Sequence, residues 1–113
     1  MHETSIAKQI LDTVLQKTRD AGAKRVLRVR GWVAETETLS RESIGFHFDA
    51  HARGTAAEGA EIALELKHLS ARCTACGHEY PPEHHLLLCP ACGSTEADIL
   101  GTPGLGVDSI DVE

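Results

Sequence analysis

The sequence predicts an α+β fold in which two helices cover a small three-stranded sheet and a short cysteine-rich domain is inserted before the last strand. Two stretches carry apolar residues at helical spacing, and two others alternate apolar with polar residues, which is typical of strands. A weaker alternation ends the chain. All four cysteines lie between the second and third predicted strands, in the sequence CTACGHEYPPEHHLLLCPAC.

An amphipathic helix from about Thr4 to Ala21 is the first predicted element. Its apolar residues recur at three- and four-residue steps and should form one buried stripe. These residues are Ile6, Ala7, Ile10, Leu11, Val14 and Leu15. Thr4 or Ser5 can cap the start of the helix, and Gly22 can end it. Because the helix begins so near the first residue, its first turn should fix where the initial residues point.

The segment from Lys24 to about Glu35 changes to a period of two and is expected to form the first strand. Its buried face should hold Leu27, Val29, Gly31 and Val33. After a polar loop, a second helix is predicted from Ser40 or Arg41 to about Ala52. The buried positions of this helix should be Ile44, Phe48 and Ala52, which recur at four-residue steps.

Two further strands complete the predicted sheet. In the second strand Ile62, Leu64 and Leu66 alternate with small or charged residues. His68 continues the inward positions of this strand, so we expect a packed residue rather than a metal ligand. The last strand lies in GVDSIDVE after a turn-rich hinge, GTPGLG. Its alternation is imperfect, and a bulge near Ser109 would reconcile it.

The cysteines form two Cys-x-x-Cys pairs, Cys73 with Cys76 and Cys89 with Cys92. Each pair bends the chain into a tight knuckle, and a glycine follows the second cysteine of each. Two knuckles complete a tetrahedron of sulfur atoms, the geometry that suits zinc, and leave no open position for water. The sequence therefore predicts a structural Zn(II) in a zinc-ribbon domain at residues 70–102. Residues 1–69 and 103–113 then form the α/β domain, with Ile99 and Leu100 ending a short hairpin of the ribbon.

Other interpretations of the cysteines are weaker. Two disulfides would need an oxidising compartment, but the chain opens MHETSIAKQI without an apolar leader, so we expect a cytoplasmic protein. A redox-active pair normally stands alone beside a βαβ pattern. His78, His84 and His85 lie inside the ribbon, and we expect them in a solvated loop. The sharper alternative is that they hydrogen-bond to or exchange with a thiolate and make the site responsive to pH.

Composition and charge exclude several classes of function. The 113 residues carry a formal charge of −6 and no long basic run, which disfavours nucleic-acid binding. The four aromatic residues offer little stacking surface for bases. We expect no transmembrane span and no enzymatic activity, because a closed four-cysteine site has no vacancy and no nucleophile triad or phosphate loop is evident. A zinc-ribbon module that binds protein or nucleic acid remains the alternative to the function inferred below.

The first three residues form a second candidate metal site. The terminal amine, backbone amides and the imidazole of His2 share one short segment, and Met1 should be retained before so large a residue. Ionised amides and imidazole in one plane suit Ni(II) or Cu(II), and Glu3 can add an amide or a carboxylate. His47 and His51 are spaced to face the same way on a helix, but no glutamate accompanies them, so we expect no metal there.

Several motifs together make the chain similar to the HypA/HybF family of hydrogenase nickel-incorporation proteins. They are MHE at the terminus, SIA opening the first helix, GAKRV, ARGT followed by EGAE, the paired cysteines, and the final IDVE. The resemblance implies a nickel-binding α/β domain with an inserted zinc ribbon. It assigns nickel to His2 with backbone nitrogens of Met1 and Glu3, and zinc to the ribbon residues Cys73, Cys76, Cys89 and Cys92.

The resemblance also implies partners. Family members work with the HypB GTPase to deliver nickel to the large subunit of [NiFe]-hydrogenase, and some also serve urease. We therefore expect a nickel metallochaperone that is a monomer or weak dimer and binds no membrane and no nucleic acid. The chain departs from its relatives at AETETLS after the first strand and in its less apolar last strand, which weakens any transfer of partner contacts there. A second histidine ligand just after the ribbon has no counterpart at Ala97, Asp98 or Ile99.

Overall fold

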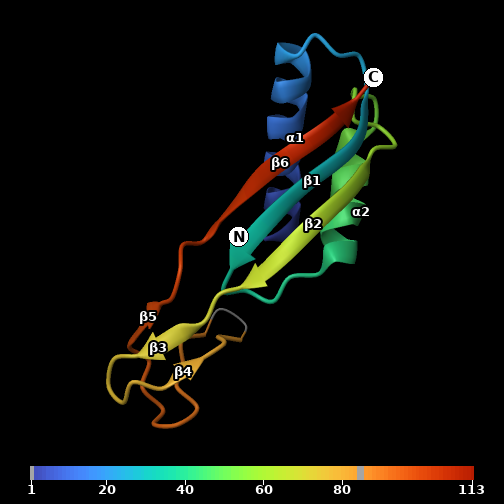
Figure 1. Cartoon of the computed structure of the whole chain (residues 1–113). Helices are drawn as coiled ribbons and strands as arrows, with labels where there is room; N and C mark the ends of the chain where they lie inside the picture. The colour runs from blue at the N-terminus through green and yellow to red at the C-terminus, as the bar shows by residue number, and fades with distance from the viewer. Residues whose placement is uncertain (1, 84–85) are drawn as a thin grey trace.

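A sheet of three strands forms the larger part of the computed structural model, which describes residues 2–83 and 86–113 (Figure 1). Its strand order is β2-β1-β6, with β1 at Val26–Glu35, β2 at Glu61–His68 and β6 at Gly104–Val112. β1 runs parallel to β2 and antiparallel to β6. The parallel pair needs a crossover, and helix α2 (Arg41–Ala52) provides it.

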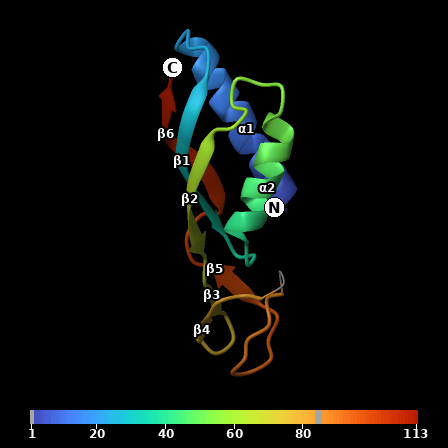
Figure 2. The same cartoon turned by 90° about the vertical axis from the view of Figure 1, so that its right-hand side faces the viewer.

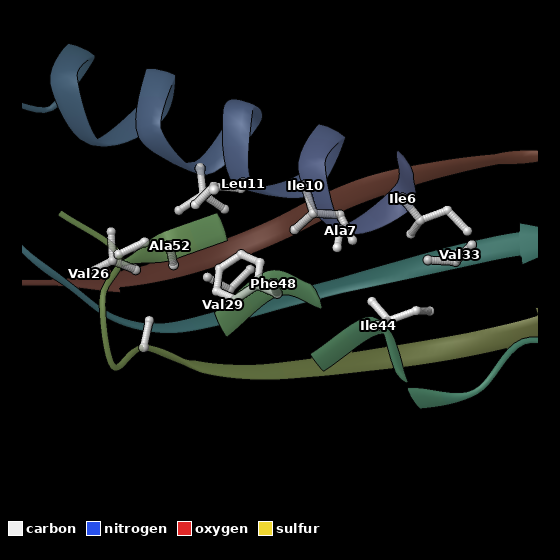
Figure 3. Close-up of a cluster of buried hydrophobic side chains, with 13 residues drawn as sticks. Ile6, Ala7, Ile10, Leu11, Val26, Val29, Val33, Ile44, Phe48 and Ala52 are labelled. Atoms are coloured by element: carbon white, nitrogen blue, oxygen red, sulfur yellow. The ribbon is translucent and has the colours of Figure 1, made fainter. Parts of the chain in front are cut away.

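Both helices lie on one face of this main sheet, as the view in Figure 2 shows. Helix α1 spans Glu3–Asp20. The predicted stripe packs inward (Figure 3), and the fully buried core residues are Ile6, Ala7, Ile10, Val14, Val29, Ile44, Phe48, Ala52 and Ala57. Thr18 joins this core although it is polar, because its hydroxyl donates to the Val14 carbonyl at 2.7 Å. The α+β fold with two helices over a three-stranded sheet is therefore confirmed.

The start of α1 differs from the prediction. The helix begins at Glu3 with His2 as its N-cap, two residues before Thr4 and three before Ser5, the caps that the sequence predicts. No side chain caps this end; the first intrahelical bond runs from the Ile6 N–H to the His2 carbonyl, at 3.0 Å. The carboxylate of Glu3 lies in the first turn, where negative charge favours a helix start.

The buried face of β1 also differs at one position. Val29, Gly31 and Val33 are buried as expected, but Leu27 is 44% exposed and Val26 is buried instead. The pairing of β1 with β6 shifts register between Val26 and Arg28. This irregularity turns Leu27 outward, which period-two alternation alone cannot anticipate.

Strand β6 is longer than predicted, because part of the supposed hinge belongs to it. Its pairing jumps from Ser109 to Val107, which leaves Asp108 as the extra residue and confirms a bulge near Ser109. Gly106, which precedes the bulge, is required by Trp32, whose indole lies against this strand. A Cβ on Gly106 would come within 2.6 Å of the indole nitrogen, so only glycine fits here.

The remaining strands form a second, smaller sheet of order β4-β3-β5 in a cysteine-rich lobe at Ala71–Ile99. They are β3 (Ala71–Cys73), β4 (Glu79–Tyr80) and β5 (Ala97–Ile99). The hairpin predicted to end at Ile99 and Leu100 is present, and its last strand ends at Ile99. The lobe extends from one end of the main sheet (Figures 1 and 2). The domain boundaries at 69/70 and 102/103 stay a prediction. Neither helix in the described part of the chain is long and apolar enough to cross a bilayer.

Candidate metal centres

Two matched knuckles bring the four cysteines together. In each, the glycine after the second cysteine donates its N–H to the carbonyl of the first: Gly77 to Cys73 at 2.9 Å and Gly93 to Cys89 at 2.8 Å. Both glycines have a positive φ, 76° and 78°, as predicted for these turns. The four Sγ atoms lie within 4.8 Å of one another. No other group of three or more candidate ligands occurs among the described residues.

The spacing of the sulfur atoms fits a tetrahedral metal rather than disulfides. Sγ of Cys73 lies 3.5 Å from Sγ of Cys92, and Sγ of Cys76 lies 3.6 Å from Sγ of Cys89. Four sulfurs at about 2.3 Å from a central zinc would be about 3.8 Å apart. A disulfide requires about 2.05 Å, and all four cysteines are free thiols. The donor set therefore fits a closed Zn(II) site of the structural type.

Without a metal, the thiols of Cys73 and Cys92 have very different pKa values. Donation by the backbone N–H of Cys76 lowers the pKa of Cys73 to about 6. The Ser94 N–H also lowers the pKa of Cys92, but the neighbouring Cys73 and Cys76 sulfurs outweigh it and raise that pKa to about 12. One thiolate forms easily and the last forms only against the charge of the others. A divalent cation at the centre removes this repulsion.

The surroundings of the sulfurs are apolar on one side only. Cys73 and Cys89 are buried, with Ala71 and Tyr80 around them, whereas Cys76 and Cys92 face solvent. Burial raises the pKa of Tyr80, and the adjacent thiolates raise it further, so its ring stays neutral. His78 is exposed and stacks on Tyr80, with centroids 6.5 Å apart. This matches the solvated position expected for His78, while His84 and His85 lie outside the described residues.

The amino terminus is held by a contact that sequence reasoning did not foresee. The Ser40 N–H donates to the Glu3 carboxylate, with 2.7 Å between Ser40 N and Glu3 Oε2. Ser40 is the N-cap of α2, and its own hydroxyl accepts from the Ser43 N–H. The carboxylate thus ties the first turn of α1 to the start of α2. Only tertiary structure brings residues 3 and 40 together, so no local pattern signals the contact.

The position of residues 2 and 3 at a helix start suits backbone chelation. His2 is exposed, and its carbonyl accepts the first intrahelical hydrogen bond. The amides of residues 2 and 3 therefore precede the first rung of the helix, so their ionisation breaks no helical bond. The positive end of the helix dipole favours the amide anion. Met1, the remaining predicted nickel ligand, lies outside the described residues.

The other histidines take different positions. His47 lies edge-on to Phe46, with centroids 5.6 Å apart, and His51 is exposed. Within the part of the chain that the structure describes, neither belongs to a cluster of three or more candidate ligands. The prediction that His68 packs inward is wrong. It is exposed at the end of β2, because that edge strand leaves the main sheet there, and its Nε2 contacts the carbonyl oxygens of Thr36 and Pro82.

Comparison with protein-family models matches residues 1–112 to "HypA: Hydrogenase/urease nickel incorporation, metallochaperone, hypA". Curated relatives named hydrogenase maturation factor HypA align along the whole chain. The Chlorobaculum tepidum protein is 37% identical over 113 residues, covering 100% of both chains. The Methanopyrus kandleri protein is 32% identical over 133 residues, covering 100% of this chain and 94% of its own.

Solved structures agree on the fold. The solution structure of the Ni metallochaperone HypA from Helicobacter pylori superposes with a TM-score of 0.61 at 16% identity. It covers 99% of this chain and 97% of that one. A second solution structure of a HypA protein gives a TM-score of 0.60 at the same identity. At this identity the likeness supports the arrangement of helices, main sheet and cysteine-rich lobe.

Proposed function

Because the chain belongs to the HypA family of hydrogenase and urease nickel-incorporation metallochaperones, we propose that it binds Ni(II) at its amino terminus and passes it to the [NiFe]-hydrogenase large subunit. The observation that carries this proposal is the full-length family match together with the sequence MHE, whose His2 is the N-cap of the first helix. Urease is a second client that the family description allows. The family consists of maturation factors, not enzymes.

The nickel ligands we propose are the imidazole and amide of His2, the amine of Met1 and the amide of Glu3. The Glu3 carboxylate is engaged by the Ser40 N–H, which supports the amide rather than the side chain as the donor. A planar set of nitrogens favours Ni(II) over Zn(II). These donors belong to three consecutive residues, so an acceptor can remove them from the ion one at a time.

The zinc ligands we propose are Cys73, Cys76, Cys89 and Cys92. Their spacing supports a closed site, which gives up its ion far less readily than an open terminal chelate. Zinc would hold together a lobe whose small apolar cluster contains few residues. Four reduced thiols also suit a cytoplasmic location, where the proposed partners, a HypB-type GTPase and the hydrogenase large subunit, would meet the chain.

A nickel titration of untagged, zinc-loaded protein tests the proposal. Wild-type protein should bind one Ni(II), and both His2→Ala and a variant with one glycine added before Met1 should lose that binding. The added residue keeps every side chain but moves the amine away from the chelate. His51→Ala is the matched control, because it removes an exposed histidine from α2 and should bind nickel as wild type does.

Two results would count against the proposal. Nickel affinity that survives both changes at the amino terminus would place the ion elsewhere in the chain. Loss of nickel in His51→Ala would move the site to α2. Zinc content measured on the same samples shows whether the cysteine site stays loaded, so a general loss of fold is distinguished from loss of the nickel ligands.

A further inference from the structure

The imidazole of His68 lies between the two parts of the molecule. Its Nε2 is 2.8 Å from the carbonyl oxygen of Thr36, which follows β1 in the helix-covered part. The same atom is 3.0 Å from the carbonyl oxygen of Pro82 in the cysteine-rich lobe. Both acceptors are carbonyls, so the nitrogen must carry the hydrogen, and one N–H is shared in a three-centre bond. The prolyl side chain beyond it is fully buried, so Pro82 is a firm attachment point.

Two backbone hydrogen bonds also lie at this junction. The Leu69 N–H donates to the Glu35 carbonyl at 2.9 Å, and the Leu100 N–H donates to the Ser70 carbonyl at 2.8 Å. The first of these continues the β1–β2 ladder, and the second pairs the two connecting segments with each other. The His68 bond to Pro82 reaches from the main sheet across to residues beyond β4.

The loop at residues 36–40 joins this contact to the amino terminus. One end of the loop accepts the His68 hydrogen bond at Thr36, and the other end donates from Ser40 to the Glu3 carboxylate. Figures 1 and 2 both place the amino terminus at the end of the main sheet from which the lobe extends. The loop is thus bounded by one hydrogen bond to the start of α1 and one to the residue that contacts the lobe.

We propose that His68 is a positioning residue, which fixes the orientation of the cysteine-rich lobe relative to the end of the molecule that carries the amino terminus. Its importance for nickel delivery rests on the proposed function, because only then does this end hold the cargo. The orientation itself does not depend on nickel. His68 binds no metal in this proposal; it acts by donating its Nε2 hydrogen to two backbone carbonyls in different parts of the chain.

The test compares His68→Ala with His68→Gln in full-length, zinc-loaded protein. The amide nitrogen of glutamine occupies about the position of Nε2 and can donate to the same carbonyls, whereas alanine has no donor. Residual dipolar couplings and ¹⁵N relaxation report whether lobe and main sheet move as one body. Wild type and His68→Gln should fit a single alignment tensor, and His68→Ala should require two. His51→Ala, an exposed histidine elsewhere, should behave as wild type.

A second measurement shows which ring nitrogen of His68 carries the hydrogen. Long-range ¹H–¹⁵N spectra of wild type should show hydrogen on Nε2 of His68 across the neutral range, and hydrogen on Nδ1 alone would overturn the proposal. A single tensor in His68→Ala would overturn it as well. If His68→Gln behaves like His68→Ala, the ring rather than its N–H holds the lobe, and the proposal is wrong.

Nickel titration of the same variants separates this inference from the proposed function. Because His68 is not a ligand, nickel affinity should remain within about threefold of wild type in all three variants. A loss of more than about tenfold in His68→Ala with intact zinc would make His68 a ligand and overturn the positioning role. If wild type itself binds no nickel, the proposed function fails while the orientation result still stands on its own.

Discussion

Replacing Glu3 separates a structural role of its carboxylate from a role as a nickel ligand. Glu3→Ala removes the acceptor that lies 2.7 Å from the Ser40 nitrogen. A hydrogen bond to a charged group contributes about 1.5–3 kcal/mol, and the lower end applies because the contact is exposed to water. Loss of a carboxylate from the first turn of a helix adds about 0.5 kcal/mol. We therefore expect the free energy of unfolding to fall by about 2 kcal/mol.

Glu3→Gln provides the matched control. Its amide oxygen can still accept from the Ser40 N–H, but the bond becomes neutral and contributes about 1 kcal/mol, so unfolding should become easier by about 1 kcal/mol. Urea denaturation of zinc-loaded protein measures both changes. Nickel affinity, measured by calorimetric titration, should stay within about threefold of wild type in both variants, because the proposed donor is the Glu3 amide and every residue has one.

The opposite pattern would refute this reasoning. If both variants lose nickel by more than about tenfold while their stability equals that of wild type, the carboxylate binds the metal and does not anchor the helix. If Glu3→Ala leaves both stability and nickel affinity unchanged, the contact with Ser40 contributes nothing in solution. In that case the amino terminus is not tied to α2.

Three further predictions concern the cysteine site and the core. Zinc affinity should fall as the pH drops below neutral, because Cys76 and Cys92, whose pKa values are raised, must release protons to bind the ion. It should fall more steeply below about pH 6, where Cys73 is protonated as well, and competition with a chromophoric chelator measures this. Gly106→Ala should destabilise the protein by about 1–3 kcal/mol because its Cβ overlaps the neighbouring indole, while Gly45→Ala in α2 should stabilise it by about 0.5–1 kcal/mol, both by urea denaturation. Phe48→Ala should cost about 3–5 kcal/mol because its ring is fully buried, whereas Phe46→Ala, 69% exposed, should change stability by less than about 0.5 kcal/mol.

Local patterns predicted much of the fold because they report which face of an element is buried. Helix α2 was predicted to its boundaries, since Ser40 caps it and Ile44 and Phe48 recur at one helical face. The two knuckles were predicted for the same reason, because Cys-x-x-Cys-Gly specifies a local turn. The four sulfurs then meet because each knuckle is already shaped to present two of them.

The errors arose where distant residues decide the outcome. Leu27 faces outward because pairing with β6 shifts register beside it, and β6 is far away in the sequence. His68 continues the alternation of β2 but lies where the chain leaves the main sheet, so its partners come from the next lobe. The Glu3 carboxylate is engaged by residue 40. Periodicity describes the face of one element, and it contains no information on what lies beyond that element's end.

The two candidate metal sites differ in how the fold supports their donors, and this difference bears on retention and release. Each pair of cysteines is held by a turn that backbone hydrogen bonds close, as between Gly77 and Cys73, so the four sulfurs would stay near a zinc ion that loosens one of them. The nitrogens of residues 2 and 3 precede the first helical hydrogen bond, from Ile6 to His2, so they can leave nickel while α1 stays intact. In the proposed nickel site, the Glu3 carboxylate anchors the helix start without entering the chelate. A chaperone needs this separation, because the group that positions the site must not be lost with the cargo.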